Sequence, residues 1–254
     1  MSELDAKNIA LLIDADNVNP KGIDSVLTVL AELGQVNIRR AYGNWAKDAL
    51  KKWGDITNGY GIRPHQQFDL TRGKNATDMA MSIDAVDLLY QGKVDGFGIM
   101  SSDSDFTPLV TRLRQDGLPV YCFGDGKTPM ALRTACTRFI DVNKLMEGAT
   151  SSRPTSAKKR SPSKAGNGVD IISGVNDDGI EDELIELLGE AWKAASRDDE
   201  GYARLQEVGQ IAGNRSSFDV RNYGFKQLSE MVRSLDRFDI VRKQDGQLYV
   251  RRLR

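Results

Sequence analysis

The stretch Ile9-Ala-Leu-Leu-Ile-Asp-Ala-Asp-Asn17 decides how the rest of the chain is interpreted. Its first five residues are apolar, and such a run is typical of a buried strand in a parallel sheet. The run then changes to two carboxylates and an amide, which a hydrophobic core does not accommodate. We therefore expect Asp14, Asp16 and Asn17 to lie at the carboxyl end of the strand, where open α/β sheets bind their ligands.

Strand and helix patterns alternate through the first part of the chain. Asn19 and Pro20 form a helix start with a side-chain cap, and Thr77 is the expected N-cap of a later helix. A short helix is also expected at residues 45–53. Strands are predicted, in order, at about residues 9–13, 36–42, 61–68, 96–100, 118–123 and 139–142. This alternation predicts an α/β fold, with a doubly wound, mostly parallel sheet covered by helices on both faces.

The composition changes at Gly148. From there to about residue 178, Ser, Thr, Pro, Gly and Lys dominate, and residues 150–168 contain five basic and no acidic residues. Such a segment is too polar to form a core and is predicted to be a disordered linker. Its basic residues 158–160 could contact phosphates or be solvated. The expected domains are therefore 1–147 and 179–254, separated by a linker at 148–178.

The last part of the chain has a different order of elements. Helical spacing of apolar residues predicts helices at about 181–194, 204–212 and 222–235. Two short strands then flank Asp245-Gly246, which is a strong signal for a two-residue hairpin turn. Three helices followed by a hairpin indicate a small winged-helix domain of the α+β class.

Bulk composition excludes some classes of protein. The 254 residues carry a net charge near zero, with 17 basic and 18 acidic residues in 1–146 and 13 and 14 in 179–254, so overall charge does not indicate nucleic-acid binding. The longest apolar run is far shorter than the roughly 20 residues of a membrane span. The chain starts without the apolar segment of a signal peptide. Cys122 and Cys136 lie in apolar surroundings and are expected to be reduced, as in a cytoplasmic protein.

Acidic residues from three segments are expected at the same edge of the sheet. Asp14 and Asp16 end the first strand, Asp103 and Asp105 follow the fourth, and Asp78 begins the helix before the fourth. Two carboxylates about 4 Å apart repel by about 4 kcal/mol at an effective dielectric of 20. The cluster therefore needs a cation, and hard oxygen ligands favour Mg²⁺ or Mn²⁺. A chain with one histidine and no cysteine cluster is a poor zinc site.

Such a metal site supports phosphodiester hydrolysis without a catalytic His, Ser or Cys. Asp84 lies six residues after Asp78, about 240° around a helix, so the two are not expected to share a metal, although Asp84 could support the site indirectly. Arg72 and Lys74 precede the site and are either phosphate contacts or ordinary loop charges. The single histidine, His65, is interpreted as a strand or loop residue, with a ligand or general base as the alternative.

Three motifs resemble the NYN domain of LabA-like proteins over about residues 7–146. They are Leu12-Ile-Asp-Ala-Asp-Asn17, Lys74-Asn-Ala-Thr-Asp78 and Ser101-Ser-Asp-Ser-Asp-Phe-Thr-Pro-Leu-Val110. The family is PIN-like, and the resemblance implies a Mg²⁺- or Mn²⁺-dependent ribonuclease. It also implies the catalytic and metal-binding residues, which are Asp14, Asp78, Asp103 and Asp105 with Asn17 beside them. The chain differs from the family pattern in its longer Lys-Asn-Ala-Thr-Asp segment and in having Ser102 instead of glycine.

Residues 179–253 resemble an OST-HTH (LOTUS) domain. The segment Asn222-Tyr-Gly-Phe-Lys-Gln-Leu-Ser-Glu-Met-Val232 and the closing hairpin carry this resemblance. It implies binding of RNA, which we expect to be single-stranded, or association with a protein partner or a second copy of the chain. Arg215, Arg221 and Lys226 flank the third helix and are candidate phosphate contacts, with a solvated helix face as the alternative.

Two other functions are compatible with the residues. The first is a binding or adaptor protein with a vestigial metal site, which Ser102 and the near-neutral charge of both domains favour. The second is a phosphatase of the haloacid dehalogenase type, because Asp14-x-Asp16 has the spacing of its nucleophile pair. The second is disfavoured because a helix starts directly after the motif, where that family usually inserts a cap domain.

Overall fold

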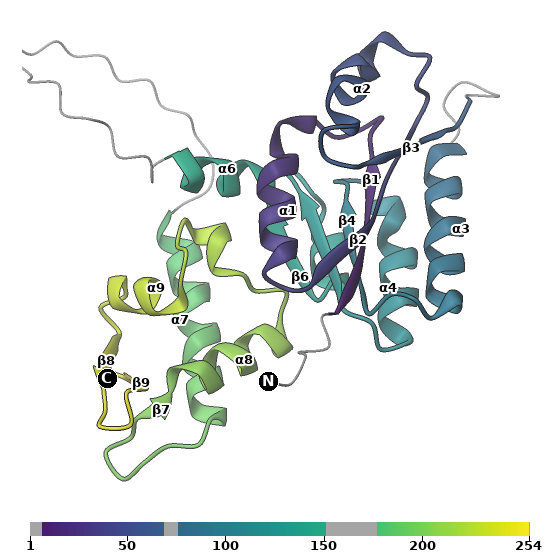
Figure 1. The fold of residues 1–254 in the computed structure, drawn as a ribbon. Helices are drawn as coiled ribbons and strands as arrows, with labels where there is room; N and C mark the ends of the chain where they lie inside the picture. Colours follow the sequence, from purple (N-terminus) through teal and green to yellow (C-terminus); the bar gives the residue numbers. More distant parts are fainter. Residues whose placement is uncertain (1–6, 69–75, 151–176, 254) are drawn as a thin grey trace, which may run out of the picture. The chain divides into compact units, whose positions relative to one another are not determined.

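The computed structural model describes residues 7–68, 76–150 and 177–253, which form two compact units. A six-stranded parallel sheet organises the first unit (Figure 1), in the order β3-β2-β1-β4-β5-β6. Its strands are β1 Asn8–Asp14, β2 Gln35–Gly43, β3 Arg63–Gln66, β4 Gly96–Met100, β5 Val120–Gly124 and β6 Arg138–Asp141. The predicted doubly wound parallel sheet is confirmed.

Strand β1 lies at the centre of the sheet, paired with β2 on one side and β4 on the other. Its side chains alternate between the two faces. Leu12 belongs to the core on the side of α3 and α4, whereas Leu11 and Ile13 belong to the core on the side of α1, and all three are fully buried. The apolar run therefore fills both cores at once, as expected for a strand covered on both faces.

Helices cover both faces of the sheet (Figure 1). They are α1 Ile23–Ala31, α2 Lys51–Thr57, α3 Ala76–Gln91, α4 Thr107–Gln115, α5 Met130–Ala135 and α6 Val142–Thr150. The chain runs from β1 outward through β2 to β3, then returns along α3 to β4, which pairs with the other side of β1. The order of strands thus reverses between β1 and β4, which is where such sheets bind ligands.

Two local predictions in this unit were wrong. The helix expected at 45–53 begins only with a 3₁₀ turn at Asp48–Leu50, because the backbone and indole nitrogens of Trp45 donate to Gln66 and His65 of β3, each at 3.0 Å. Thr77 is not an N-cap, since α3 already begins at Ala76 and the Thr77 hydroxyl donates to Asp16 at 2.9 Å.

The second unit contains a small three-stranded sheet, in the order β7-β9-β8 with antiparallel pairing. The elements of the C-terminal part are α7 Asp177–Ala194, β7 Ala203–Arg204, α8 Leu205–Arg215, α9 Leu228–Ser234, β8 Phe238–Arg242 and β9 Leu248–Arg252. These elements confirm the predicted small α+β domain. Strand β7 was not predicted, because two residues are too few to show a period.

Glycine conformations correct two predictions in the C-terminal part. The helix expected at 222–235 is divided into a 3₁₀ turn, Val220–Tyr223, and α9, because Gly224 between them has a φ of 80°. The hairpin is longer than two residues: β8 ends at Arg242 and β9 begins at Leu248. Gly246 takes a φ of 77° and donates to the Lys243 carbonyl at 3.0 Å, as in a turn that ends with a left-handed residue.

The ends of the predicted linker are helical, since α6 extends to Thr150 and α7 begins at Asp177. The rest of that prediction, residues 151–176, lies outside the described residues. No helix of the described ranges is long and apolar enough to cross a membrane.

Shortening Leu12 to alanine is expected to destabilise the first unit by about 2–5 kcal/mol, because its fully buried side chain leaves a cavity that the central strand cannot close. Urea unfolding followed by the fluorescence of Trp45 and Trp53 measures this. Met130→Ala, at a side chain 68 % exposed, is the control and should change stability by less than about 0.5 kcal/mol. A loss below about 1 kcal/mol for Leu12→Ala would contradict this account of the core.

Candidate functional site

The predicted acidic residues come from three segments that meet at the carboxyl edge of the sheet. Asp14 ends β1, Asp103 and Asp105 follow β4, and Asp78 lies in the first turn of α3. Because β1 and β4 are hydrogen-bonded neighbours, their carboxyl ends lie side by side. The structure therefore brings together the four acidic residues that the sequence singled out.

We call Asp14, Asp78, Asp103 and Asp105 the carboxylate cluster. Asp14 is its buried member, with a side chain that is fully inaccessible to solvent. Its oxygens accept hydrogen bonds from the Asn17 amide at 3.0 and 3.2 Å and from the Ser101 hydroxyl at 2.9 Å. Burial raises the pKa of Asp14, whereas the hydrogen bonds from the Asn17 and Ser101 side chains lower it. The charges of Asp16 and Asp103 raise it further. These bonds fix the carboxylate at the end of the strand.

Ser101 connects Asp14 to Asp103. Its hydroxyl donates to Asp14 and accepts the backbone N–H of Asp103 at 3.1 Å. The Asp103 carboxylate in turn accepts the N–H of Asp105 at 2.9 Å and caps the 3₁₀ turn Ser104–Phe106. Ser101 was not predicted as a site residue, although its position directly after a buried strand and before two acids could have indicated it.

The repulsion within the cluster is most evident at Asp78. Burial first, and then repulsion from Asp14, Asp103, Asp105 and Asp16, raises the pKa of Asp78 to about 6. Repulsion of this kind requires that the carboxylates lie near one another. Within the described part of the chain, no Lys or Arg nitrogen lies within 4.0 Å of the carboxylates of Asp14, Asp78 or Asp103.

Asp16 has a different environment from Asp14, although only one residue separates them. Its carboxylate accepts the Thr77 hydroxyl at 2.9 Å and the Asn44 backbone N–H at 3.3 Å, and it lies 3.5 Å from the Lys47 ammonium. Asp16 thus ties the loop after β1 to the end of β2 and the start of α3. It supports the frame of the site, with its charge balanced by lysine.

The donor set of the cluster fits a hard divalent cation, because it consists of carboxylate oxygens alone. The arrangement is not closed around an ion: among the described residues, no three His, Cys, Asp or Glu side chains are placed to hold a metal. Asp14 already shares its oxygens with Asn17 and Ser101. Side chains must therefore rotate before three of the carboxylates can ligate one ion.

Asp84 and His65 lie in another polar group, around β2 and β3. The carboxylate of Asp84 accepts hydrogen bonds from the guanidinium of Arg40 and the hydroxyl of Tyr42. Burial and this bond to Asp84 raise the pKa of Tyr42. The ring of His65 lies 5.0 Å from that of Tyr42, and burial lowers the pKa of His65. The charge of Asp84 is thus balanced by the guanidinium of Arg40.

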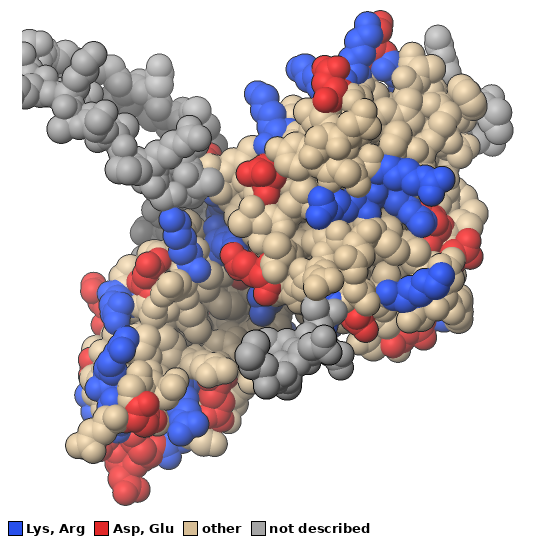
Figure 2. All heavy atoms as spheres, viewed as in Figure 1, with Lys and Arg blue, Asp and Glu red and all other residues tan. Residues whose placement is uncertain are grey.

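The predicted phosphate contacts have different environments. Arg72 and Lys74 lie outside the described residues. Arg215, at the end of α8, and Lys226, just before α9, are exposed. The guanidinium of Arg221 lies 3.0 Å from the Asp219 carboxylate, so part of its charge is already balanced. Basic and acidic side chains are interspersed on the face shown in Figure 2.

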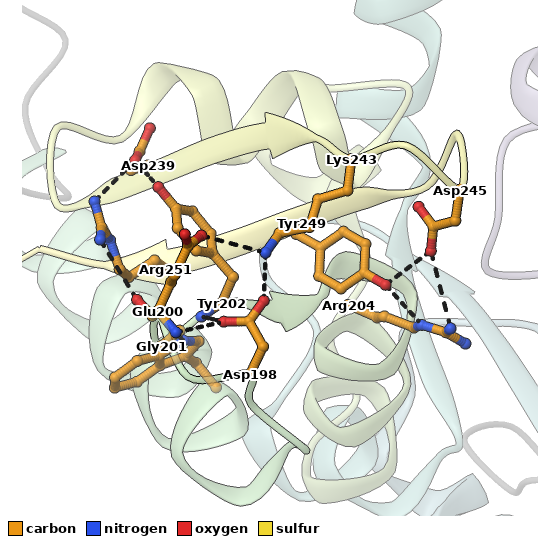
Figure 3. A network of polar contacts seen from close by, with 11 residues as sticks. Asp198, Glu200, Gly201, Tyr202, Arg204, Asp239, Lys243, Asp245, Tyr249 and Arg251 are labelled. Atoms are coloured by element: carbon orange, nitrogen blue, oxygen red, sulfur yellow. Dashed lines mark hydrogen bonds and ion pairs between the residues drawn. The ribbon is translucent and has the colours of Figure 1, made fainter.

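Other basic residues of the C-terminal part are held in a polar network (Figure 3). Lys243 forms an ion pair with Asp198, and its ammonium lies 5.0 Å from the centre of the Tyr202 ring. Arg251 lies over the same ring at 4.5 Å and 3.3 Å from Asp239. These contacts join β8, β9 and the segment before β7. Among the predicted phosphate contacts that the structure describes, Arg215 and Lys226 are exposed, whereas Arg221 is paired with Asp219.

Replacing Asp78 with Asn is expected to stabilise the metal-free protein at neutral pH. The pKa of Asp78 is about 6 in the folded protein and 3.8 in its ordinary state, so its ionisation disfavours folding. The gain in melting temperature should be full above about pH 6 and vanish below about pH 4. Calorimetry in EDTA across this range measures it, with the exposed Asp87→Asn on the same helix as control. A pH-independent effect of Asp78→Asn would contradict the crowding of charges.

Comparisons with known proteins identify relatives of both parts. The sequence is 30 % identical over 121 residues to Uncharacterized protein MJ0482 of Methanocaldococcus jannaschii, a match that covers 46 % of this chain. The chain spans about half, 47 %, of the length of that curated relative. A protein of unknown function, VPA0982 from Vibrio parahaemolyticus, gives a TM-score of 0.46 at 20 % identity, covering 56 % of this chain and 96 % of that structure.

Family models match both parts of the chain. The OST-HTH/LOTUS domain matches residues 179–250, and the NYN domain matches residues 8–146. The match to residues 8–146, more than half of the chain, contains the whole carboxylate cluster and the six-stranded sheet that positions it. The chain therefore belongs to the NYN domain family, with a PIN-like fold followed by an OST-HTH/LOTUS domain.

Proposed function

We propose that this protein is a divalent-metal-dependent ribonuclease that cleaves phosphodiester bonds of RNA, and that its LOTUS domain holds the RNA. The observation that carries the proposal is the gathering of carboxylates at one edge of the sheet, where burial and then mutual repulsion raise the pKa of Asp78 to about 6. Such a cluster disfavours its own ionisation, and a bound dication reverses that penalty. Its place at the switch point of the sheet also supports the proposal.

Asp14, Asp78 and Asp103 would hold Mg²⁺ or Mn²⁺ directly or through water. A bound ion would lower the pKa of a water molecule and neutralise charge that develops on the phosphoryl oxygens. Asp105 is exposed and would complete the ligand set or orient the attacking water. Because burial and repulsion make Asp78 the acid that protonates near neutral pH, it must lose its proton before it can act as a ligand.

Asn17 has two possible tasks at this site. Its amide nitrogen donates to both oxygens of Asp14, which fixes the orientation of that carboxylate. Its exposed position at the edge also suits contact with the scissile phosphate. Ser101 has the supporting task of holding Asp14 and the backbone of Asp103 in register.

An adaptor protein with a vestigial metal site is the second candidate. One observation favours it: in the described part of the chain, the carboxylates are not arranged as a closed ligand set. The haloacid dehalogenase interpretation is less well supported, because Asp16 is engaged by Thr77 and Lys47 and the family match is to the NYN domain.

Cleavage of labelled single-stranded RNA by the purified chain with Mn²⁺ tests the proposal. Asp103→Asn is expected to reduce the cleavage rate at least about 100-fold, because one charged ligand is lost at the reacting phosphate. Asp87→Asn, an exposed acid on α3, is the matched control and should leave the rate unchanged. Cleavage that survives Asp103→Asn would indicate a contaminant, and absence of cleavage in the unsubstituted protein would favour the adaptor.

Arg215→Gln and Lys226→Gln are each expected to weaken RNA binding and to reduce the salt dependence of the association constant. A lost phosphate contact lowers the slope of log K against log salt by about 0.7 on single strands. Fluorescence anisotropy with labelled RNA at several salt concentrations measures this. Lys193→Gln on α7, whose ammonium is already paired with Glu190 at 2.7 Å, is the control. An unchanged slope in both variants would remove these residues from the RNA interface.

We propose that the chain has two domains, at residues 1–147 and 179–254. The family matches at 8–146 and 179–250 support them.

A further inference from the structure

A cavity of about 410 Å³ opens at the carboxyl edge of the sheet, and we call it the edge cavity. It is lined by residues 17–19 after β1, Met100 and Ser102 at the end of β4, and residues 123–125 at the end of β5. The 3₁₀ turn before α1, through Lys21 and Gly22, and the first turns of α6 complete its walls. Its volume lies within the range of about 300–1,000 Å³ that is usual for small-molecule sites.

The edge cavity adjoins the carboxylate cluster. Asn17 lines the cavity and at the same time donates to both oxygens of Asp14. Ser102, which also lines it, directly precedes Asp103 in the chain. The apolar residues of the cavity belong to the side of the sheet covered by α1 and α6, whereas Asp78 lies on α3 at the other face. A ligand could therefore contact both places across the edge of the sheet.

The walls combine apolar surface with amide and hydroxyl groups. The apolar part consists of Val18, Met100, Phe123, Val142 and Met146. Polar groups come from Asn17, Asn19, Ser102, Asp125 and Asn143. A nucleobase needs such a mixture, because its faces are apolar and its edge presents hydrogen-bond donors and acceptors. Aliphatic lipids would leave these polar groups unsatisfied.

One wall of the cavity is held rigidly. The Ser102 hydroxyl accepts the backbone N–H of Asp125 and the hydroxyl of Thr128, each at 3.0 Å. Arg133 donates to the carbonyl oxygens of Thr128 and Gly126 at 2.7 and 2.6 Å. The loop after β5 is thus fixed before any ligand arrives, which reduces the entropy lost on binding.

A lysine stands at the rim of the cavity. Lys21 lies in the 3₁₀ turn Pro20–Gly22, which is capped by Asn19, and its side chain is exposed. Within the described ranges, no carboxylate lies within 4.0 Å of its ammonium. An unpaired ammonium beside a mixed pocket suits the phosphate that accompanies a nucleobase.

We propose that the edge cavity is a subsite for one nucleobase of an RNA strand whose neighbouring phosphate lies at the Asp14–Asp103 carboxylates. This inference rests on the proposed ribonuclease function and gives a physical reason for the preference for a single strand. A base paired in a duplex cannot enter a cavity, whereas an unstacked base can. The base in the edge cavity would set which phosphodiester bond lies at the carboxylates.

The test asks whether removing one base of the RNA and narrowing the mouth of the cavity weaken RNA binding through the same interaction. The full chain carrying Asp103→Asn, which keeps the RNA intact, is titrated with labelled five-nucleotide RNAs that have one abasic position each. We expect one abasic position to weaken binding about tenfold, because burial of a base on apolar walls is lost. Asn143→Trp, which narrows the mouth, should weaken binding of the intact RNA similarly and abolish the effect of that abasic position.

Matched variants distinguish the cavity from general effects. Gln115→Trp, at the exposed end of α4, controls for the added indole. Lys21→Gln should weaken binding about three- to fivefold, whereas Lys93→Gln, an exposed lysine before β4, should not. Lys21→Gln also keeps the test decisive if Asn143→Trp does not fold, because it leaves the walls unchanged.

Cross-linking in the unsubstituted chain gives an independent readout. An RNA with 4-thiouridine at the sensitive position should form adducts on peptides that contain Met100, Phe123 or Met146. Three results would each overturn the inference. They are adducts on other peptides, an abasic effect that is the same with and without Asn143→Trp, and no detectable binding of RNA. Cleavage of RNA with Mn²⁺ is measured separately. If the RNA is cleaved but Asn143→Trp does not change the effect of the abasic position, the subsite is rejected and the ribonuclease proposal stands.

Discussion

Repulsion between carboxylates at the ends of β1 and β4 is the constraint on which the rest of the site depends. Two adjacent parallel strands deliver Asp14 and Asp103 to the same edge, and α3 adds Asp78. Hydrogen bonds from Asn17 and Ser101 make the buried Asp14 tolerable, but they do not cancel the charge of the group. Burial first, and then this repulsion, raises the pKa of Asp78.

The same edge contains a further acid, Asp16, whose charge is balanced by Lys47. Asp16 is bound by Thr77, the Asn44 backbone and Lys47, so it can hold three segments together without a metal. Asp84 is likewise held by Arg40 and Tyr42. Asp16 and Asp84 are thus paired with cations, whereas Asp14, Asp78 and Asp103 have no Lys or Arg nitrogen within 4.0 Å among the described residues.

The two parts of the chain meet RNA, in our proposal, through different physical interactions. At the sheet edge, carboxylates handle the phosphate and the edge cavity handles a base, with Asn17 common to both. In the C-terminal part, Lys243 and Arg251 are occupied by carboxylates and by the ring of Tyr202. Phosphate contact there depends on a few exposed residues such as Arg215 and Lys226.

The sequence by itself determined the order of strands and helices, the parallel sheet and the identity of the clustered acids, because apolar periodicity and abrupt carboxylates are local signals. It did not determine where Thr77, Trp45 or Asp16 would direct their hydrogen bonds, since each bonds to a segment distant in the chain. The positive φ angles of Gly224 and Gly246 divide a predicted helix and lengthen a predicted hairpin loop, and composition alone does not specify these angles. Only the tertiary structure decided that Ser101 joins two acids and that a cavity forms beside them, because both depend on which strands become neighbours.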